Sequence, residues 1–238
     1  MIELIGLDGD DTLWRNEDYF TVTQDRFGEL LGPYLPSPYL PSGIDVQRAL
    51  ETTERRNLEV FGYGAKGFTL SLIETAIELT DGRVPAAVIQ DLVGFGRWIL
   101  THPVELLEGV ADVVTELSAS GRRLVIVTKG DLMHQEHKVA GSGLADLFDA
   151  IEIVSEKDEM TYRRLLERAH VMPDRFLMVG NSVRSDVLPV LAIGGQAVHI
   201  PYHTTWAHEH ADHDGSVPTL ASIRDLPAWL DTLSPKPR

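Results

Sequence analysis

The sequence predicts an α/β protein with a Rossmann-like parallel sheet core and an inserted all-α domain. Short apolar runs alternate with segments of helical periodicity in residues 105–238. One further apolar run stands at the start of the chain, and residues 15–104 separate it from the others with no convincing strand pattern. Strands that alternate with helices imply right-handed crossovers and a parallel sheet. We therefore assign residues 1–14 and 105–238 to the core and residues 15–104 to a helical domain.

The expected core strands are short and almost wholly apolar. The first ends at Leu7 and is followed at once by a run of carboxylates. Short apolar runs broken by glycine and acidic residues are typical of buried parallel strands. Further strands are expected at residues 124–127, 151–154, 176–179 and 197–200. Helices are expected near residues 110–120, 131–140 and 159–170, and between the last two strands.

Helical periodicity also dominates the insertion. Asn16 is a plausible N-cap of a first helix, and Pro85 suits the start of a last helix that reaches about Leu100. Four prolines within residues 32–43 exclude a regular helix there. A helix over residues 45–60 and a following one are expected on either side of a glycine-rich turn at residues 62–67.

Composition limits the classes of function. The chain has 238 residues and a net charge of −15, with no basic stripe, so binding to nucleic acid or to an anionic membrane is not expected. The absence of cysteine excludes disulfides and zinc–thiolate sites. No apolar run approaches the roughly 20 residues of a membrane span. Glu3 stands where a signal peptide would carry basic residues, so we expect a cytoplasmic protein.

Polar side chains follow four of the expected strands. Carboxyl ends of parallel strands meet at one edge of a sheet, where ligands bind in open α/β folds. Three carboxylates within four residues repel one another, and a divalent cation is the simplest group that offsets their repulsion. The polar residues at these strand ends are Asp8, Asp10, Asp11, Thr128, Lys129, Lys157, Asn181 and Asp186.

The ordered set resembles the motifs of the haloacid dehalogenase-like superfamily of phosphohydrolases. A D-x-D-x-T motif stands at residues 8–12, a Thr at position 128, a Lys at position 157, and Gly180-Asn181 with Asp186 in place of a G-D-x-x-x-x-D motif. In that family a helical cap of the C1 type follows the first motif, where residues 15–104 lie. The match spans nearly the whole chain.

The resemblance implies a Mg²⁺-dependent phosphatase acting on a small phosphorylated metabolite. Asp8 would attack phosphorus and form an aspartyl-phosphate. Asp10 would protonate the leaving oxygen and then serve as base for the hydrolytic water. The phosphoryl-binding residues would be Gly9, Thr128, Lys129 and Lys157, although Lys129 is equally explained as a surface lysine. The metal-binding residues would be Asp8, Asp10 through its backbone carbonyl, Asn181 and Asp186.

Two other functions compete with this hypothesis. Family members that cleave carbon–halogen bonds lack the second aspartate, because halide leaves without a proton, so Asp10 counts against a 2-haloacid dehalogenase. Phospho-acceptor receiver domains also group carboxylates, Thr and Lys around Mg²⁺, but they lack a cap and the D-x-D spacing. Asn181 departs from the family pattern: its amide oxygen can ligate Mg²⁺ but carries no charge, so either Asp186 compensates for the missing charge or metal binding is weak.

Two further segments have possible ligand-binding roles. The turn at residues 62–67 offers Tyr63 for stacking and Lys66 for an acidic or second phosphate group, so we expect these two residues to select the substrate. An ordinary helix–helix connection is the alternative. Five histidines between positions 199 and 213 could bind zinc, but we interpret the segment as a polar loop.

Overall fold

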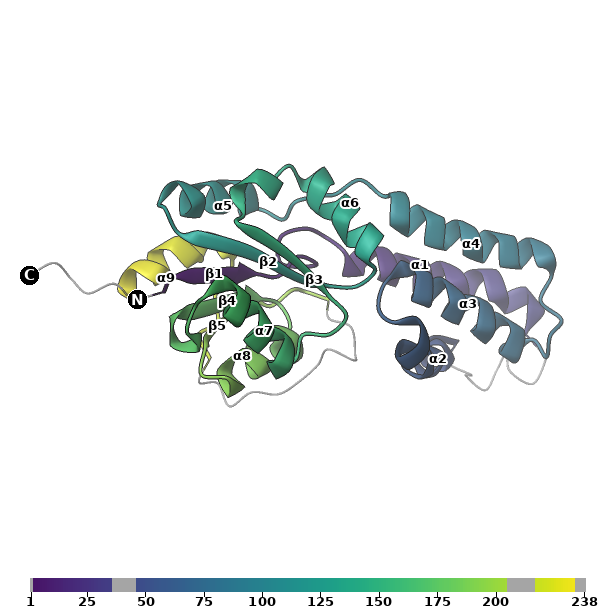
Figure 1. The fold of residues 1–238 in the computed structure, drawn as a ribbon. Helices are drawn as coiled ribbons and strands as arrows, with labels where there is room; N and C mark the ends of the chain where they lie inside the picture. The colour runs from purple at the N-terminus through teal and green to yellow at the C-terminus, as the bar shows by residue number, and fades with distance from the viewer. Residues whose placement is uncertain (1, 36–45, 205–216, 234–238) are drawn as a thin grey trace, which may run out of the picture. The chain divides into compact units, whose positions relative to one another are not determined.

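A computed structural model describes residues 2–35, 46–204 and 217–233. The chain divides into two compact units, one formed by residues 1–17 with 104–238 and the other by residues 18–103 (Figure 1). The domain boundaries expected from the sequence differ from these by at most three residues. We call the first unit the core and the second the helical unit, and each is described by itself.

The core contains a five-stranded parallel sheet, as the sequence predicted. Its strands are β1 Leu4–Leu7, β2 Arg123–Lys129, β3 Ala150–Val154, β4 Phe176–Gly180 and β5 Gln196–His199. All four strand pairs are parallel, and the spatial order is β3-β2-β1-β4-β5. The predicted α/β fold with a parallel sheet is therefore confirmed.

The strand order makes β1 the centre of the sheet. From β1 the chain adds β2 and β3 on one side, then crosses to add β4 and β5 on the other side. The direction of winding therefore reverses at β1. In open α/β sheets, the crevice outside the carboxyl ends of strands at such a reversal is where ligands bind. The segment that follows Leu7 occupies that position.

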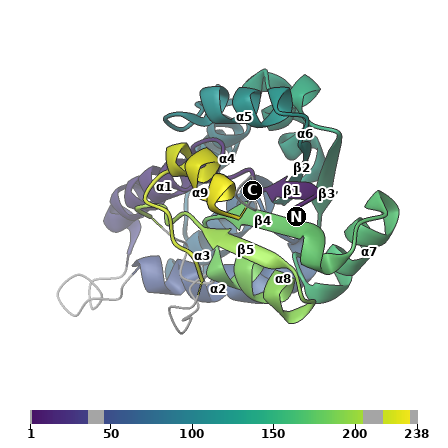
Figure 2. The ribbon, with the colours of Figure 1, turned by 90° about the vertical axis from the view of Figure 1, so that its left-hand side faces the viewer.

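Helices cover both faces of the sheet (Figures 1 and 2). The core helices are α5 Val110–Ala119, α6 Leu132–Ser142, α7 Glu159–Ala169, α8 Leu188–Ala192 and α9 Leu226–Thr232. Side chains of α5, α6 and α9 pack in one apolar cluster, and those of α7 and α8 pack in another. The sequence did not predict α9, whose Leu226 and Leu230 are buried against the first cluster.

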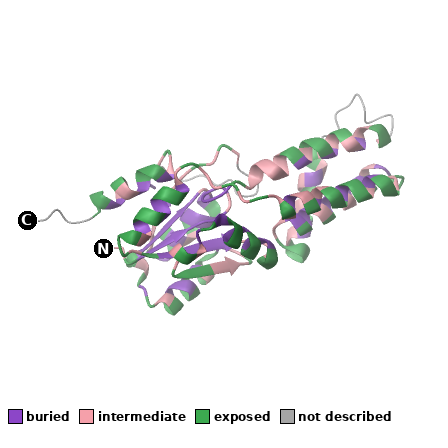
Figure 3. Ribbon diagram, turned by 90° about the horizontal axis from the view of Figure 1, so that it is seen from above, coloured by how far each residue is buried: buried purple, intermediate pink, exposed green. Residues whose placement is uncertain are grey.

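Successive side chains along the strands belong alternately to these two clusters. Ile5 and Leu7 of β1 belong to the cluster with α5, whereas Leu4 belongs to the cluster with α7. Residues i and i+2 of a strand share a face, so this division follows directly from the pleat. Figure 3 shows the buried positions concentrated along the central strands. A strand apolar on both faces holds its carboxyl end in a fixed position.

Four α-helices form most of the helical unit in its described residues, 18–35 and 46–103. They are α1 Glu17–Leu31, which starts at the end of the core segment, α2 Val46–Phe61, α3 Ala65–Leu79 and α4 Ala86–Thr101. Phe27, Leu72 and Leu92 are among the side chains buried between them. No strand occurs among the described residues of this unit. Within the described part of the chain, none of the helices has the length and apolar character needed to span a bilayer.

The expected turn at residues 62–67 is shorter than predicted. Helix α3 begins at Ala65, so Lys66 and Gly67 lie in its first turn rather than in a loop. Gly62 and Gly64 have positive φ angles of 69° and 105°, which glycine adopts without steric cost. A Cβ at Gly67 would lie 2.7 Å from the carbonyl oxygen of Gly62. Backbone conformation and close backbone packing therefore explain these three glycines, a reason that the sequence pattern alone did not reveal.

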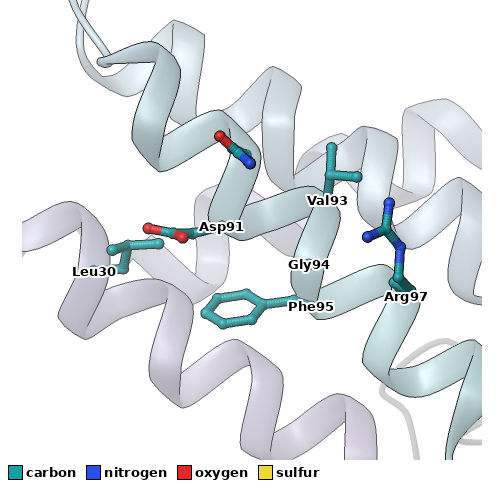
Figure 4. A pocket seen from close by; sticks show the side chains of 7 residues that line it. Leu30, Asp91, Val93, Gly94, Phe95 and Arg97 are labelled. Carbon is teal, nitrogen blue, oxygen red and sulfur yellow. The ribbon is translucent and has the colours of Figure 1, made fainter.

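A hollow of about 590 Å³ lies within the helical unit (Figure 4). Its lining includes Leu30 of α1 and the α4 residues Asp91, Phe95 and Arg97. Asp91 and Phe95 point toward Leu30 in this view. The hollow contains none of the residues that the sequence singled out.

Candidate active site

The carboxyl ends of β1 to β4 bring the predicted polar residues together. The Asp8 backbone N–H donates to the Val179 carbonyl of β4 at 3.0 Å, which continues the strand pairing one residue past β1. On the other side, Leu7 is in register with Ile126 of β2. Asp8 therefore lies between the ends of β2 and β4, at the reversal point of the sheet.

A buried lysine joins two of these carboxylates. Lys157 Nζ donates to Asp8 Oδ1, and it donates to Asp186 Oδ1 at 2.7 Å. All three side chains are at most 8% exposed. A backbone N–H from Ser182 holds the second oxygen of Asp186 at 3.0 Å. A buried charge is tolerated when it is paired and hydrogen-bonded, so this triad forms one electrostatic unit.

Burial and charge act in opposite directions on Asp8 and Lys157. Burial raises the pKa of Asp8 to about 7, with Asp186 adding to the rise and Lys157 opposing it. For Lys157, burial works against the charged form, but Asp186 and Asp8 outweigh it and raise the pKa of the ammonium above its usual value. Lys157 therefore stays cationic at neutral pH. A fixed cation against a carboxylate is suited to stabilising an anion transferred to that carboxylate.

Asp10 lies in a separate network. Trp14 Nε1–H and Lys138 Nζ both donate to its Oδ1 at 2.6 Å, and Gln135 Nε2 donates to its Oδ2 at 2.9 Å. Burial alone would raise the pKa of Asp10, but the Lys138 charge and these three hydrogen bonds outweigh it and lower the pKa below its usual value. The Asp10 side chain keeps 23% of its surface exposed. It is thus ionised, held in place and still reachable.

Thr128 and Gly9 form a small polar recess beside Asp8. The Thr128 hydroxyl oxygen is buried, and it has no hydrogen-bond partner among the described residues. A Cβ at Gly9 would lie 3.0 Å from that oxygen and 2.7 Å from the Trp14 ring. Only glycine fits here without a shift of its neighbours. A buried hydroxyl without a partner indicates a place where a ligand oxygen binds.

Asn181 reaches the same region through Thr12. The Thr12 hydroxyl donates to Asp8 Oδ2 at 2.9 Å and lies 3.4 Å from Asn181 Oδ1. The Asn181 backbone N–H donates back to Thr12 Oγ1 at 3.1 Å. The amide oxygen of Asn181 and one carboxylate oxygen of Asp8 are therefore close to a single hydroxyl group.

Lys129 has partners away from Asp8. Its Nζ forms an ion pair with Glu156 Oε1 at 3.3 Å and donates to Ser185 Oγ at 2.9 Å. Glu156 Oε1 also accepts the backbone N–H of Lys157 at 2.9 Å. In this structure Lys129 links the segments that follow β3 and β4. Its expected contact with phosphate stays a prediction.

Asp11 has a structural role in the turn that follows β1. Its φ angle of 62° is left-handed, which aspartate tolerates better than most residues. Its carboxylate accepts the backbone N–H groups of Asn16 at 2.8 Å and of Glu17 at 3.0 Å. The Asn16 amide oxygen instead accepts from Lys138 at 3.0 Å. Asp11, rather than Asn16, thus binds the backbone at the start of α1.

The two predicted specificity residues belong to the helical unit. Tyr63 is half-buried in the α2–α3 connection, and Lys66 is an exposed residue of the first turn of α3. Their selection of substrate stays a prediction. Of the histidine-rich segment, residues 205–216 lie outside the described part of the chain, so its proposed zinc binding is not addressed.

Comparisons with known proteins agree with this geometry. Residues 2–194 match the family model of haloacid dehalogenase-like hydrolases. This protein belongs to that family. A haloacid dehalogenase-like family hydrolase from Xanthomonas campestris is 46% identical, with a TM-score of 0.84, over 98% of this chain and 91% of its own. No curated protein matched.

More distant structures share the fold of this haloacid dehalogenase-like hydrolase but differ in their named activities. A predicted phosphoglycolate phosphatase from Haemophilus somnus is 17% identical, with a TM-score of 0.62, over 96% of this chain and 98% of its own. A 2-haloacid dehalogenase from Pseudomonas syringae is 21% identical, with a TM-score of 0.65, over 98% of this chain and 100% of its own. The fold is therefore compatible with more than one hydrolytic reaction.

The donor atoms of this hydrolase fit Mg²⁺. Oxygen ligands from one or two carboxylates, completed by water and substrate phosphate, are typical of Mg²⁺ sites. Asp8 offers a carboxylate, Asn181 an amide oxygen and Asp10 a backbone carbonyl. Asp186, the fourth predicted ligand, accepts hydrogen bonds from Lys157 and Ser182 and is 1% exposed, so its role as a metal ligand stays a prediction. No group of three or more His, Asp or Glu side chains in the described ranges could hold a metal ion alone.

Two residues of this site were missed by sequence reasoning, and a third, Thr12 of the D-x-D-x-T motif, was assigned no role. Lys138 and Gln135 of α6 contact Asp10, and Thr12 connects Asp8 with Asn181. Positions 135 and 138 are three residues apart, so they share one face of a helix. A lysine and a glutamine on a helix that follows a motif strand were therefore the available signal. The pattern was overlooked because such residues usually face solvent.

Proposed function

We propose that this hydrolase is a Mg²⁺-dependent phosphatase that cleaves a small phosphomonoester through an aspartyl-phosphate at Asp8. The observation that carries the proposal is the position of Asp10. Its carboxylate lies two residues from the nucleophile and keeps an exposed surface. An alkoxide leaving group needs a proton, whereas a halide does not. A group for proton transfer beside Asp8 thus favours an ester over a haloacid.

The environment of Asp8 supports an anionic transferring group. Phosphoryl transfer is catalysed mainly by positioning and by neutralising charge on the phosphoryl oxygens. Lys157 supplies a buried cation, and the Thr128 hydroxyl is a buried donor without a partner among the described residues. At about 4 Å and an effective dielectric constant near 20, a lysine–phosphoryl contact contributes roughly 4 kcal/mol before desolvation is counted.

The proposed reaction has two steps, formation and hydrolysis of the aspartyl-phosphate. In the first, Asp10 has taken up a proton from solvent; a carboxylate oxygen of Asp8 then bonds to phosphorus, the ester P–O bond breaks and Asp10 gives this proton to the leaving oxygen. In the second, water attacks phosphorus, Asp10 takes the water's proton and the bond between phosphorus and Asp8 breaks. Inorganic phosphate leaves, and both aspartates return to their starting forms.

The metal and the helical unit complete the proposal. The side-chain oxygens of Asp8 and Asn181 and the backbone carbonyl of Asp10 would hold Mg²⁺. The bound ion would neutralise negative charge on the phosphoryl oxygens. The helical unit would act as a cap that excludes water and contacts the leaving group. In that role Tyr63 and Lys66 would select the metabolite.

The test is product release from two substrate panels. Purified enzyme is given phosphorylated metabolites or 2-haloacids, each with Mg²⁺ and with EDTA. We expect many turnovers of phosphate release with Mg²⁺ and at least a hundredfold loss with EDTA. A single equivalent of phosphate would indicate a phospho-acceptor domain. Halide release that persists in EDTA would indicate a dehalogenase, and either result would overturn the proposal.

A further inference from the structure

Helix α6 contributes two side chains that contact Asp10 and belong to none of the family motifs found in the sequence. Lys138 and Gln135 are 7% and 2% exposed, which is unusual for residues of these types. Both use their polar end groups on the same carboxylate, one on each oxygen. Burial of a long cationic side chain costs rotamer entropy and hydration. The contact with Asp10 is what offsets that cost.

The surrounding contacts fix the two side chains. Lys138 Nζ also donates to Asn16 Oδ1 at 3.0 Å, and Gln135 Nε2 also donates to the Lys129 carbonyl at 3.0 Å. Gly130 leaves room for Gln135, because a Cβ there would lie 2.9 Å from its Nε2. The network therefore joins α6, the end of β2 and the segment before α1.

We propose that Lys138, supported by Gln135, is the positioning residue that fixes the Asp10 carboxylate for proton transfer. The inference rests on the proposed phosphatase function. With Trp14, the two residues place three donors around the carboxylate and leave its exposed edge for the substrate. Catalytic groups must be held close to their productive geometry, and a carboxylate on a loop is free to rotate without such contacts. Lys138 acts through Asp10 and touches no reacting atom.

Esters with different leaving groups separate this role from general damage. Nitrophenolate leaves without a proton, so the first step with p-nitrophenyl phosphate needs no acid, while the second step still needs Asp10 as base. For Lys138→Met we expect kcat to fall at least tenfold with kcat/KM within threefold, and a burst of nitrophenolate equal to the enzyme. For a simple alkyl phosphate, kcat/KM should also fall at least tenfold. Lys138→Arg, which keeps the charge, should recover most of the loss.

A double-mutant cycle tests whether Lys138 works through Asp10. Asp10→Asn should show the same split between the two esters. Adding Lys138→Met to Asp10→Asn should cost less than twofold more, because the group that Lys138 positions is already lost. Gln135→Met serves as a second variant if Lys138→Met fails to fold. Arg175→Met is the matched control, since it removes an exposed ion pair with Glu3 at the opposite end of β1 and should leave both esters unchanged.

The Trp14 indole supplies a readout without turnover. Its Nε1–H donates to Asp10 Oδ1, so its ¹⁵N–¹H resonance reports the place of that carboxylate. Lys138→Met should shift this resonance and Lys138→Arg should largely restore it. If the wild type hydrolyses no ester, the phosphatase proposal fails while this measurement still decides the positioning role. Equal losses of kcat and kcat/KM on both esters, full additivity with Asp10→Asn, or an unmoved indole resonance would overturn the inference.

Discussion

Three buried or partly buried acidic side chains of the core have a lysine as partner, whereas one in the helical unit has none among the described residues. In the core, Asp8 and Asp186 share Lys157, and Asp10 is paired with Lys138. In the helical unit, Glu54 of α2 has a buried carboxylate oxygen with no hydrogen-bond partner in the described part of the chain. The two lysines thus stabilise the charged carboxylates at the carboxyl edge of the sheet, where the proposed reaction needs them. Glu54 is left without such compensation.

Glycines of the two units also differ in what their missing side chain makes possible. Gly9 and Gly180 leave room for functional side chains, because a Cβ would meet Thr128 at the first and Asp186 at the second. Gly62 and Gly64 instead allow positive φ angles between α2 and α3, and Gly67 allows close approach of the Gly62 carbonyl. A glycine-rich sequence pattern therefore indicates close approach, but only the neighbouring atoms show whether a ligand or a turn is the cause.

The largest expected effect comes from removing the Asp8 charge. Asp8→Asn should lower kcat by about 10⁴-fold or more, because an amide is too poor a nucleophile for phosphoryl transfer. Phosphate release on a good substrate measures the loss, and circular dichroism should show an intact fold, since the amide oxygen can still accept from Lys157 and the amide NH₂ can donate to the Thr12 hydroxyl oxygen. Retention of a tenth of wild-type activity would contradict a covalent mechanism.

A smaller effect is expected from the α2–α3 connection. Lys66→Ala and Tyr63→Ala should each lower kcat/KM about tenfold to a hundredfold for the preferred metabolite, once the substrate panel identifies it. The same variants should leave p-nitrophenyl phosphate unaffected, because its leaving group is small and carries no acidic group. Glu59→Ala is a control for an exposed charge on α2. Equal losses on both substrates would indicate a damaged fold, and no loss would leave the segment a plain connector.

The fold and the residues at the strand ends were predictable for a physical reason. Each expected strand is short and mostly apolar, and polar residues follow four of the five, so both the strands and their ends are visible in the local sequence. Parallel pairing then implies that Asp8, Thr128, Lys157 and Asp186 meet, although up to 178 positions separate them. The short helix α9 was missed because its seven residues make only about two helical turns, too few for a period to be recognised.

The contacts of Asp10 were not predictable in this way. Lys138 is 128 positions from Asp10, and its place on a helix after a motif strand is not enough to distinguish it from a solvated lysine. Its burial depends on how α6 packs against the strand ends, which is a tertiary property. Likewise, the sequence left Lys129 as either a phosphate ligand or a surface lysine, and its contacts with Glu156 and Ser185 are visible only in the structure. The strand ends in the sequence therefore indicate which residues lie at the site, but tertiary packing determines which hydrogen bonds and ion pairs they form.

The amide at position 181 gives a test of the metal site. Asn181→Asp adds a negative charge near Asp8, so Mg²⁺ affinity should rise about tenfold after the desolvation of the new carboxylate is counted. Isothermal titration with Mg²⁺ measures the change. Without metal the extra carboxylate should lower the melting temperature, because Lys157 is already shared by two acids. Unchanged or weaker affinity would mean that Asn181 is not a ligand.

The smallest expected effect tests the uncompensated acid of the helical unit. Burial, reinforced by Glu51, raises the pKa of Glu54 from 4.5 to about 8. The folded protein therefore binds more protons than the unfolded chain between these values, and its stability falls as pH rises from about 4.5 to 8. Glu54→Gln removes the ionisation and should cancel this loss.

One pKa unit corresponds to about 1.4 kcal/mol, and the partial exposure of Glu54 reduces the effect, so we expect a gain of about 1–2 kcal/mol at pH 8. At pH 5, where Glu54 is protonated in the folded protein, the variant and the wild type should agree within about 0.5 kcal/mol. Urea unfolding at the two pH values measures the difference. The exposed Glu59→Gln on the same helix is the matched control and should change neither value. An equal effect of Glu54→Gln at both pH values would mean that the carboxylate is solvated, and the contrast with the paired acids of the core would then disappear.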